Sequence, residues 1–394
     1  MTPAPPLRLT RLRLTDFRSY PSFEQRFAGR IVAIAGPNGV GKTNLLEAIS
    51  LLGPGRGLRG AKAGEIGRRA GGAPALPWAA FGAFEGPEGL TEIGTGTSGE
   101  PGAEKARRKF LVDGEAAKSQ AEIARHAGAV WLTPQMDRLF QDGASGRRRF
   151  LDRLVWALEP GHAREVAAHD TAMAGRNRLL AEGRRDAAWL AALEDAMARH
   201  AVAAVAGRRA LCQRLNLLLA AGTATGAFPA ARLDLLCPIA TALDEAPALA
   251  VEDRLRAALA ECRGRDAAAG GAAQGAHRSD MELVHLPKGL EAALCSTGEQ
   301  KALLVSVVLA HAALIGAARG FAPLLLLDEV AAHLDQTRRE ALYEALACLP
   351  AQVFLTGTEP DIFAPLADLA EGFWATPEGL RPMSHGVVPG AAIR

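Results

Sequence analysis

Gly36-Pro-Asn-Gly-Val-Gly-Lys-Thr43 is the stretch of this sequence that decides its fold. It matches the phosphate-binding pattern GxxxxGK(S/T). Before it, Arg30-Ile-Val-Ala-Ile-Ala35 is a short apolar run typical of a buried parallel strand. After it, Asn44-Leu-Leu-Glu-Ala-Ile-Ser-Leu-Leu52 carries apolar residues at helical spacing. A strand, a glycine-rich turn and a helix form the context that this motif requires, which argues against a chance match.

The residue types in this motif suit the phosphate chain of a nucleotide. Glycines let the backbone curl so that successive N–H groups face an anion, and the helix N-terminus adds partial positive charge. Lys42 supplies a full positive charge, and Thr43 offers a hydroxyl to a magnesium ion. The nucleotide-binding residues that we predict here are Gly36, Pro37, Asn38, Gly39, Val40, Gly41, Lys42, Thr43 and Asn44.

A second motif, Leu324-Leu-Leu-Leu-Asp-Glu329, is an apolar strand pattern that ends in two carboxylates. Asp328 at the strand tip can hold Mg2+, directly or through water, beside Thr43. Glu329 is placed to polarise an attacking water, so we predict it as the catalytic residue of ATP hydrolysis. Taken alone, this run could be an ordinary strand end. Because a phosphate loop occurs in the same chain, an ATP site is favoured.

Ser296-Thr-Gly-Glu-Gln-Lys301 precedes this strand and opens a helix expected over 298–314. A serine hydroxyl, a glycine N–H and a helix N-terminus can bind a second anion, and a plain N-capped helix is the alternative. The loop resembles the signature loop of the ABC ATPase superfamily, which contacts the γ-phosphate of a partner subunit's ATP. By the same resemblance, Asp335 stands where the D-loop lies, and Thr356 stands where a switch residue lies near the γ-phosphate.

The composition is typical of a soluble globular protein of about two or three domains, with 394 residues, 49% hydrophobic and 22% charged. Five cysteines without a CxxC pair argue against a disulfide framework or a zinc site and favour a cytoplasmic location. The N-terminus lacks the apolar core of a signal peptide. No stretch reaches the ~18 apolar residues of a membrane span, so no membrane association is expected.

Arginine dominates the basic residues and occurs in short runs, although the net charge is only +2. Local basic patches on a nearly neutral protein favour a surface that meets nucleic acid, and a solvated helix face is the alternative for each run. We single out Arg147, Arg148 and Arg149 as candidates for binding DNA or ATP, or for holding a helical arm on the ATPase head. The other runs are Arg68-Arg69, Arg107-Arg108-Lys109, Arg184-Arg185 and Arg208-Arg209.

The sequence pattern and the composition change twice along the chain. Residues 1–118 contain strand patterns around the phosphate loop, with a glycine- and arginine-rich loop at 53–72 and a Gly/Pro/Ser tract at 94–102. Residues 119–290 are rich in helix formers, with a loop expected at 265–274. Residues 291–394 return to alternating strands and helices. We therefore predict an α/β fold: a P-loop ABC/SMC-type ATPase head, a mixed sheet with flanking helices, interrupted by an inserted, mainly helical arm lobe.

The motifs together resemble the RecF family in the SMC-like branch of the ABC ATPases. The resemblance spans nearly the whole chain and includes Leu12–Tyr20, Arg147–Asp152 and His277–Asp280 besides the three ATPase motifs. It implies an ATP-dependent homodimer that binds gapped, single-stranded or duplex DNA in recombinational repair and replication. It further implies slow ATP hydrolysis as a switch, and RecA loading together with RecO and RecR.

The resemblance also implies roles for single residues. Ser296, Gly298 and Lys301 would face the partner's nucleotide, Arg18 would approach phosphates, and Gln135 would act as the metal-associated Q-loop residue. One departure is Glu299, which stands where the family commonly has glutamine. Its carboxylate weakens the contact with the partner's phosphate or, if it points away, changes nothing.

Three other classes of protein fit parts of the sequence. The ATPase subunit of a membrane transporter has a much shorter insertion between its phosphate loop and its signature loop. A head fragment of a long SMC-type coiled coil requires sustained heptads that this chain lacks. A P-loop kinase of small molecules leaves the loop at Ser296–Lys301 unexplained.

Overall fold

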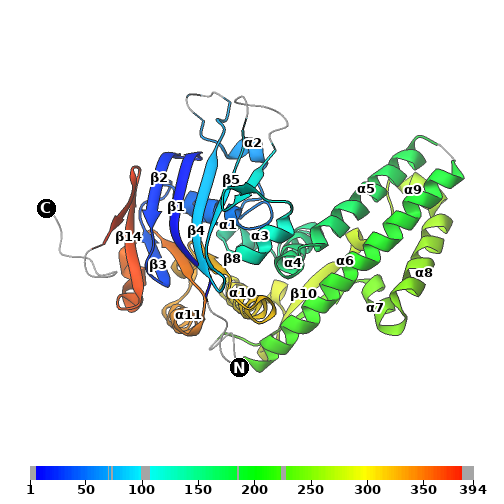
Figure 1. The fold of residues 1–394 in the computed structure, drawn as a ribbon. Helices are drawn as coiled ribbons and strands as arrows, with labels where there is room; N and C mark the ends of the chain where they lie inside the picture. The colour runs from blue at the N-terminus through cyan, green and yellow to red at the C-terminus, as the bar shows by residue number, and fades with distance from the viewer. Residues whose placement is uncertain are drawn as a thin grey trace. The chain divides into compact units, whose positions relative to one another are not determined.

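The computed structural model describes residues 6–69, 71, 74–98, 107–183, 186–222 and 228–383 (Figure 1). The chain divides into two compact units. We call the first unit, residues 1–137, 221–230 and 296–394, the head, and the second, residues 138–220 and 231–295, the arm. The Arg184-Arg185 run and the end of the 94–102 tract lie outside the described residues.

A six-stranded sheet in the head carries the phosphate loop and the Asp-Glu motif. Its strand order is β15-β14-β3-β13-β12-β8, and only β15 runs antiparallel to its neighbour. Every residue of β3, β12 and β13 is buried, which explains their continuous apolar sequences. The bounds are β3 Ile31–Ala35, β8 Ala129–Leu132, β12 Leu324–Leu327, β13 Val353–Gly357, β14 Ala370–Thr376 and β15 Gly379–Pro382.

Strand β8 belongs to this sheet because it pairs in parallel with β12, with Leu132 opposite Leu327. The helix-forming residues around this segment predict a place in the arm, and its pairing with β12 corrects that prediction. Parallel strands end at one edge of a sheet, so β3, β8, β12 and β13 deliver the residues that follow them to the same place.

The second head sheet is antiparallel, in the order β2-β1-β4-β5-β6-β7. Helix α1, Lys42–Leu52, contacts strands of both sheets, and this position explains why nearly all its residues are buried. The strands are β1 Arg8–Phe17, β2 Tyr20–Arg26, β4 Ala79–Gly86, β5 Gly89–Gly96, β6 Lys109–Val112 and β7 Glu115–Ala116. The expected loop at 53–72 contains a short helix, α2, Ala63–Ile66.

The remaining head helices are α3, Gln120–His126, α10, Thr297–Arg319, and α11, Gln336–Cys348. Helix α10 is long and apolar enough to cross a membrane by length and composition alone. However, 83% of its most apolar window is buried inside the protein, as in the core helix of a soluble fold.

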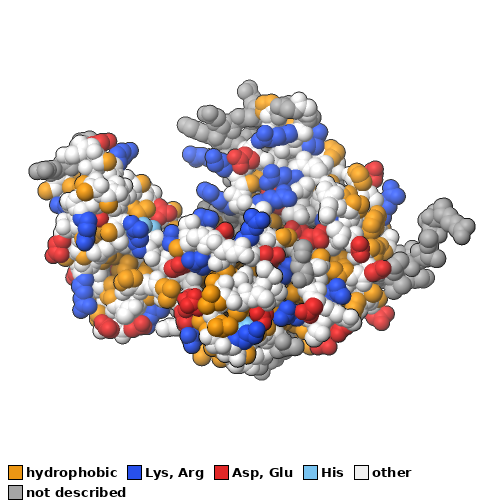
Figure 2. Space-filling view, turned by 180° about the vertical axis from the view of Figure 1, so that it is seen from behind, with side chains coloured by type: hydrophobic (Ala, Val, Ile, Leu, Met, Phe, Trp, Pro, Cys, Tyr) orange, Lys and Arg blue, Asp and Glu red, His pale blue; other side chains and the backbone are white. Residues whose placement is uncertain are grey.

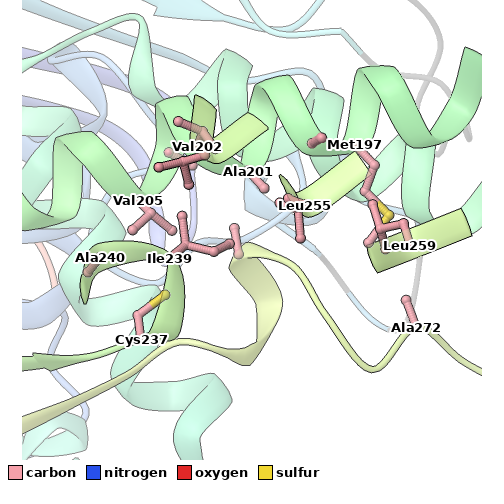
Figure 3. Packing of buried hydrophobic residues seen from close by; sticks show 14 of the residues in the cluster. Met197, Ala201, Val202, Val205, Cys237, Ile239, Ala240, Leu255, Leu259 and Ala272 are labelled. Atoms are coloured by element: carbon pink, nitrogen blue, oxygen red, sulfur yellow. The ribbon is translucent and has the colours of Figure 1, made fainter. Parts of the chain in front are cut away.

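Among its described residues, the arm contains six α-helices, three short 3-10 helices and a small sheet in the order β11-β10-β9. Apolar side chains of α6, α7 and α8 form its core (Figure 3). The elements are α4 Ala144–Leu158, α5 His162–Ala181, α6 Ala187–Ala221, α7 Pro238–Glu245, α8 Ala248–Glu261, α9 Arg263–Ala269, β9 Ala231–Leu236, β10 Asp280–His285 and β11 Leu290–Glu291.

The loop expected at 265–274 is partly wrong, because α9 continues to Ala269. Alanines favour the helix, and Gly270 ends it with a left-handed φ of 73°.

An ion network is buried in the arm beside this helix. Arg176, which is 0% exposed, donates to Glu194 Oε1 at 3.0 Å, to Asp266 Oδ2 at 2.7 Å and to the Leu259 carbonyl at 2.7 Å. Arg263 donates to both carboxylate oxygens of Glu194. The network ties α5, α6, α8 and α9 together.

We expect Arg176→Ala to lower the free energy of unfolding by about 3–5 kcal/mol, because it leaves Glu194 and Asp266 buried with one partner fewer. Urea unfolding followed by circular dichroism measures this loss. The matched control is Arg199→Ala, which breaks an exposed pair with Asp195 and should cost less than about 1 kcal/mol. Equal losses in the two variants would contradict a structural role for the buried network.

Candidate nucleotide-binding site

Residues 36–41 form a tight loop between β3 and α1 in the head. Gly39 and Gly41 have φ values of 82° and 115°, which glycine adopts without strain. A Cβ atom on Gly41 would lie 2.6 Å from Tyr20 Oη and 3.0 Å from Ser19 Oγ. Among the described residues no side chain caps α1, so the N–H groups of its first turn remain available to an anion.

Lys42 lies against this loop and is only 5% exposed. Its Nζ donates to the carbonyl oxygens of Gly36, at 2.6 Å, and Pro37, at 3.1 Å. The ammonium also lies 3.2 Å from Glu329 Oε1. The structure therefore brings the lysine of the first motif directly to the glutamate of the second.

Asp328 is the buried centre of the site. Thr43 Oγ1 lies 3.0 Å from both of its carboxylate oxygens, and Thr356 Oγ1 donates to Oδ1 at 2.8 Å. Burial raises the pKa of Asp328, and the two threonine hydroxyls act in the opposite direction. A carboxylate beside a hydroxyl is an oxygen-donor set of the kind Mg2+ prefers, so Thr43 and Asp328 fit this ion.

Glu329 adopts a left-handed backbone conformation, with φ of 53°. Its N–H donates to Thr356 Oγ1 at 3.0 Å. Such a conformation in a residue other than glycine is strained, and strain of this kind concentrates at functional sites.

Arg18 reaches α1 from the turn between β1 and β2. Its guanidinium donates to both carboxylate oxygens of Glu47, at 2.8 and 2.5 Å, and to the Glu65 carbonyl at 2.9 Å. A second arginine, Arg59, was not predicted from the sequence; it donates to Glu47 Oε2 and to Asn44 Oδ1, both at 2.8 Å. The sequence does contain one signal for such a partner: Glu47 is a single carboxylate in an otherwise apolar helix. In the structure Glu47 is only 1% exposed, so its charge requires partners.

The signature-like loop starts α10 with a reciprocal cap. Glu299 Oε2 accepts hydrogen bonds from the Ser296 N–H at 3.0 Å and hydroxyl at 2.9 Å, and the Glu299 N–H faces Ser296 Oγ at 3.4 Å. Arg338 Nη1 would lie 2.7 Å from a Cβ atom on Gly298, and it pairs with Asp335 at 3.1 Å. Asp335 caps α11. Gly298 and Asp335 thus both lie against Arg338, and among the described residues no hydrogen bond joins Ser296, Gly298 or Asp335 to the phosphate loop.

Lys301 and Gln135 differ in their exposure to solvent. Lys301 is buried and its Nζ lies 3.4 Å from Asp137 Oδ2 of the same chain. Burial lowers the pKa of Lys301, whereas Asp137 and Glu329 raise it. Gln135 is exposed in the 3-10 turn Pro134–Arg138 that follows β8. Contacts of these residues with a nucleotide or a metal stay predictions.

Comparison with known proteins identifies the class and then the family. The family model described as RecF/RecN/SMC N terminal domain matches residues 8–370, so the chain is an SMC-type ATPase head protein. It is 47% identical to the DNA replication and repair protein RecF of Rhizobium etli (strain CIAT 652), over 93% of this chain and 96% of the relative. It is also 47% identical to RecF of Rhizobium meliloti (strain 1021), over 92% of this chain and 96% of that relative. The chain belongs to the RecF family of DNA replication and repair proteins.

Solved structures confirm the predicted fold class. A structure of the recombination mediator protein RecF with ATPrS, in the RecFOR pathway, superposes with a TM-score of 0.82 and 20% identity, covering 98% of this chain and 100% of that one. A structure of the same mediator with ATP gives a TM-score of 0.77. Neither match concerns a transporter ATPase or a kinase.

Gly41 tests how tightly the loop is packed. We expect Gly41→Ala to cost about 1–3 kcal/mol more in stability than Gly39→Ala, because a Cβ atom at position 41 meets the buried Tyr20 side chain. Both residues have positive φ, and at Gly39 nothing lies within 4 Å of the added atom, so that variant is the matched control. The measurement is thermal unfolding of both variants; equal unfolding temperatures would mean that the β1–β2 turn yields to the added methyl group.

Proposed function

We propose that this chain binds ATP and Mg2+ at the phosphate loop, pairs with a second copy when ATP is bound, and binds DNA in recombinational repair and replication. The observation that carries the proposal is the contact of Thr43 with Asp328, which joins two motifs 285 residues apart. Family membership supports the same function, because the relatives are DNA replication and repair proteins and a RecF structure contains ATP.

Each residue of the site has a part in this proposal. The open N–H groups of the loop and the Lys42 ammonium bind the phosphates, and Thr43 and Asp328 hold Mg2+, with Gln135 as a further ligand. The ion supplies charge neutralisation for the phosphates. Glu329 is the base that accepts a proton from water. Because its carboxylate faces Lys42 in this structure, it becomes free when Lys42 turns to a phosphate.

A second copy completes the site in this proposal. Ser296, Gly298, Lys301 and Asp335 would contact the nucleotide of the partner, so that ATP joins two heads. Hydrolysis then works as a slow switch that ends the pairing. We further propose that the ATP-bound dimer acts in the cytoplasm on gapped, single-stranded or duplex DNA, and acts with RecO and RecR in loading RecA.

The three arginines of the run in α4 have different surroundings, and we assign them different roles. Arg147 donates to both oxygens of Asp280, at 2.8 and 2.7 Å, and Arg148 donates to the Ser279 carbonyl at 2.8 Å. These two side chains therefore fasten α4 to the segment that begins β10. Arg149 is exposed, and of the three it is the one we propose to contact DNA.

A second candidate DNA surface lies on the head. Exposed basic side chains come from the loop before α2 and from the start of β6, and Arg108 joins these segments by donating to the carbonyls of Leu51, Gly53 and Gly55. Burial lowers the pKa of Arg108 to about 9. Lys and Arg side chains gather at this end of the head in Figure 2. The exposed members are Arg56, Arg59, Lys62, Arg107 and Lys109.

Two variants of the site test the ATP switch together. Glu329→Gln should bind ATP, hydrolyse it slowly and accumulate dimers, because only the base is lost. Lys42→Ala should lose ATP affinity and remain a monomer, because the phosphate charge is unmatched. Nucleotide titration gives the affinity for ATP, phosphate release gives the hydrolysis rate, and light scattering with ATP and Mg2+ gives the mass. A Lys42→Ala protein with wild-type affinity, or a Glu329→Gln protein with wild-type hydrolysis, would refute these roles.

Arg149→Ala should flatten the dependence of log K for DNA on log salt concentration by about 0.9, the effect of one lost phosphate contact on duplex DNA. DNA titrations at several salt concentrations give the slope. Arg148→Ala is the comparison on the same helix: it should reduce stability through the lost bond to Ser279 and leave the slope unchanged. A wild-type slope for a folded Arg149→Ala protein would remove Arg149 from the DNA surface.

A further inference from the structure

Thr356 makes two hydrogen bonds that the sequence did not foreshadow. It lies near the end of β13, is 1% exposed, and donates its hydroxyl proton to Asp328 Oδ1 at 2.8 Å. Thr356 Oγ1 also accepts a hydrogen bond from the N–H of Glu329 at 3.0 Å. One hydroxyl therefore contacts the proposed metal ligand and the backbone of the proposed base.

The hydrogen-bonding capacity of this hydroxyl is nearly exhausted. A threonine hydroxyl has one proton to donate and two lone pairs to accept with. The proton is directed to Asp328, and one lone pair receives the Glu329 N–H. No proton remains for a phosphate oxygen while these bonds persist. The role expected from the resemblance, a switch residue beside the γ-phosphate, therefore competes with the contacts that the structure shows.

The contact with Glu329 occurs where the backbone is strained. Glu329 has φ of 53°, a conformation that residues other than glycine rarely adopt without support. Strand pairing places Thr356 in position to give this support, because Leu327, the last residue of β12, lies opposite Leu355, and Thr356 is the next residue of β13. The hydroxyl receives the N–H at the point where the chain turns away from β12.

We propose that Thr356 is a positioning residue that couples the metal ligand to the base: its hydroxyl orients the Asp328 carboxylate and holds Glu329 in its strained conformation. This inference rests on the proposed ATPase function. The Glu329 side chain pairs with Lys42 in this structure. When Lys42 turns to a phosphate, Thr356 keeps the Glu329 backbone fixed, so that the released carboxylate remains directed at the site.

Two substitutions distinguish the contribution of the Thr356 hydroxyl from that of the shape of its side chain. Thr356→Val removes both hydrogen bonds with little change in volume, and Thr356→Ser keeps the hydroxyl. We expect Thr356→Val to lower kcat for ATP hydrolysis about tenfold or more, as the loss of one to two hydrogen bonds in the transition state implies. Its affinity for ATP without Mg2+ should stay at the wild-type value, and the gain in affinity on adding Mg2+ should shrink. Thr356→Ser should restore both properties.

The control is Thr10→Val, another threonine of a head strand, whose hydroxyl donates to the Ala83 carbonyl at 3.1 Å away from the site. It should leave kcat and nucleotide affinity unchanged. Thermal unfolding of all variants establishes that each is folded. Measuring ADP affinity beside ATP affinity tests the competing role, because a direct contact with the γ-phosphate would make Thr356→Val weaken ATP binding and spare ADP binding.

The outcomes distinguish this inference from the function on which it rests. A wild-type protein that binds no ATP overturns the proposed function, and the inference with it. Where wild type hydrolyses ATP, a folded Thr356→Val protein with wild-type kcat overturns the inference alone. Selective loss of ATP affinity over ADP affinity overturns it in favour of the γ-phosphate contact. A Thr356→Ser protein as impaired as Thr356→Val shows that the methyl group matters and also overturns it.

Discussion

The carboxylate of Asp328 is the constraint on which the rest of the head depends. A buried carboxylate without partners destabilises a protein by several kcal/mol, so a strand that ends in one must end beside donors. Those donors come from both sides: Thr43 from the helix after β3, and Thr356 from β13. The parallel register of β3, β13 and β12 places both hydroxyls there. The order of the strands therefore meets the need of the buried Asp328 carboxylate for hydrogen-bond donors, and the same order assembles the site.

The local parts of this arrangement could be predicted from the sequence. The phosphate loop, the apolar strand before Asp328 and the helix after Ser296 are each encoded by a few adjacent residues, and the comparisons confirm the fold class that they indicate. The missed features depend on partners distant in sequence. The sequence shows Glu47 as a lone carboxylate in an apolar helix but does not show that Arg59 is its partner, and the sequence of β8 does not reveal its place beside β12. Helix α9 was missed for another reason, since glycines near its alanines suggested a loop.

The arginine runs show why composition alone misleads about nucleic acid. Arg147 and Arg208, which both belong to such runs, are occupied inside the arm: Arg147 with Asp280, and Arg208 with both oxygens of Asp152. A planar guanidinium makes two parallel bonds to a carboxylate, and this geometry suits an internal tie as well as it suits a phosphate. Burial and partners distinguish the two uses, and in α4 they leave Arg149 exposed.

Two of the residues that we propose to meet phosphates, Lys42 and Ser296, are engaged with acceptors of the chain itself. Lys42 bonds to the carbonyls of its own loop and pairs with Glu329, and the N–H and hydroxyl of Ser296 both bond to Glu299. Glu299 therefore neither points away from the signature-like loop nor stands free beside it. An arriving phosphate exchanges one set of hydrogen bonds for another, so its net gain is much smaller than the number of its contacts suggests. In the proposed mechanism, the release of Glu329 is therefore tied to the step in which Lys42 changes partner.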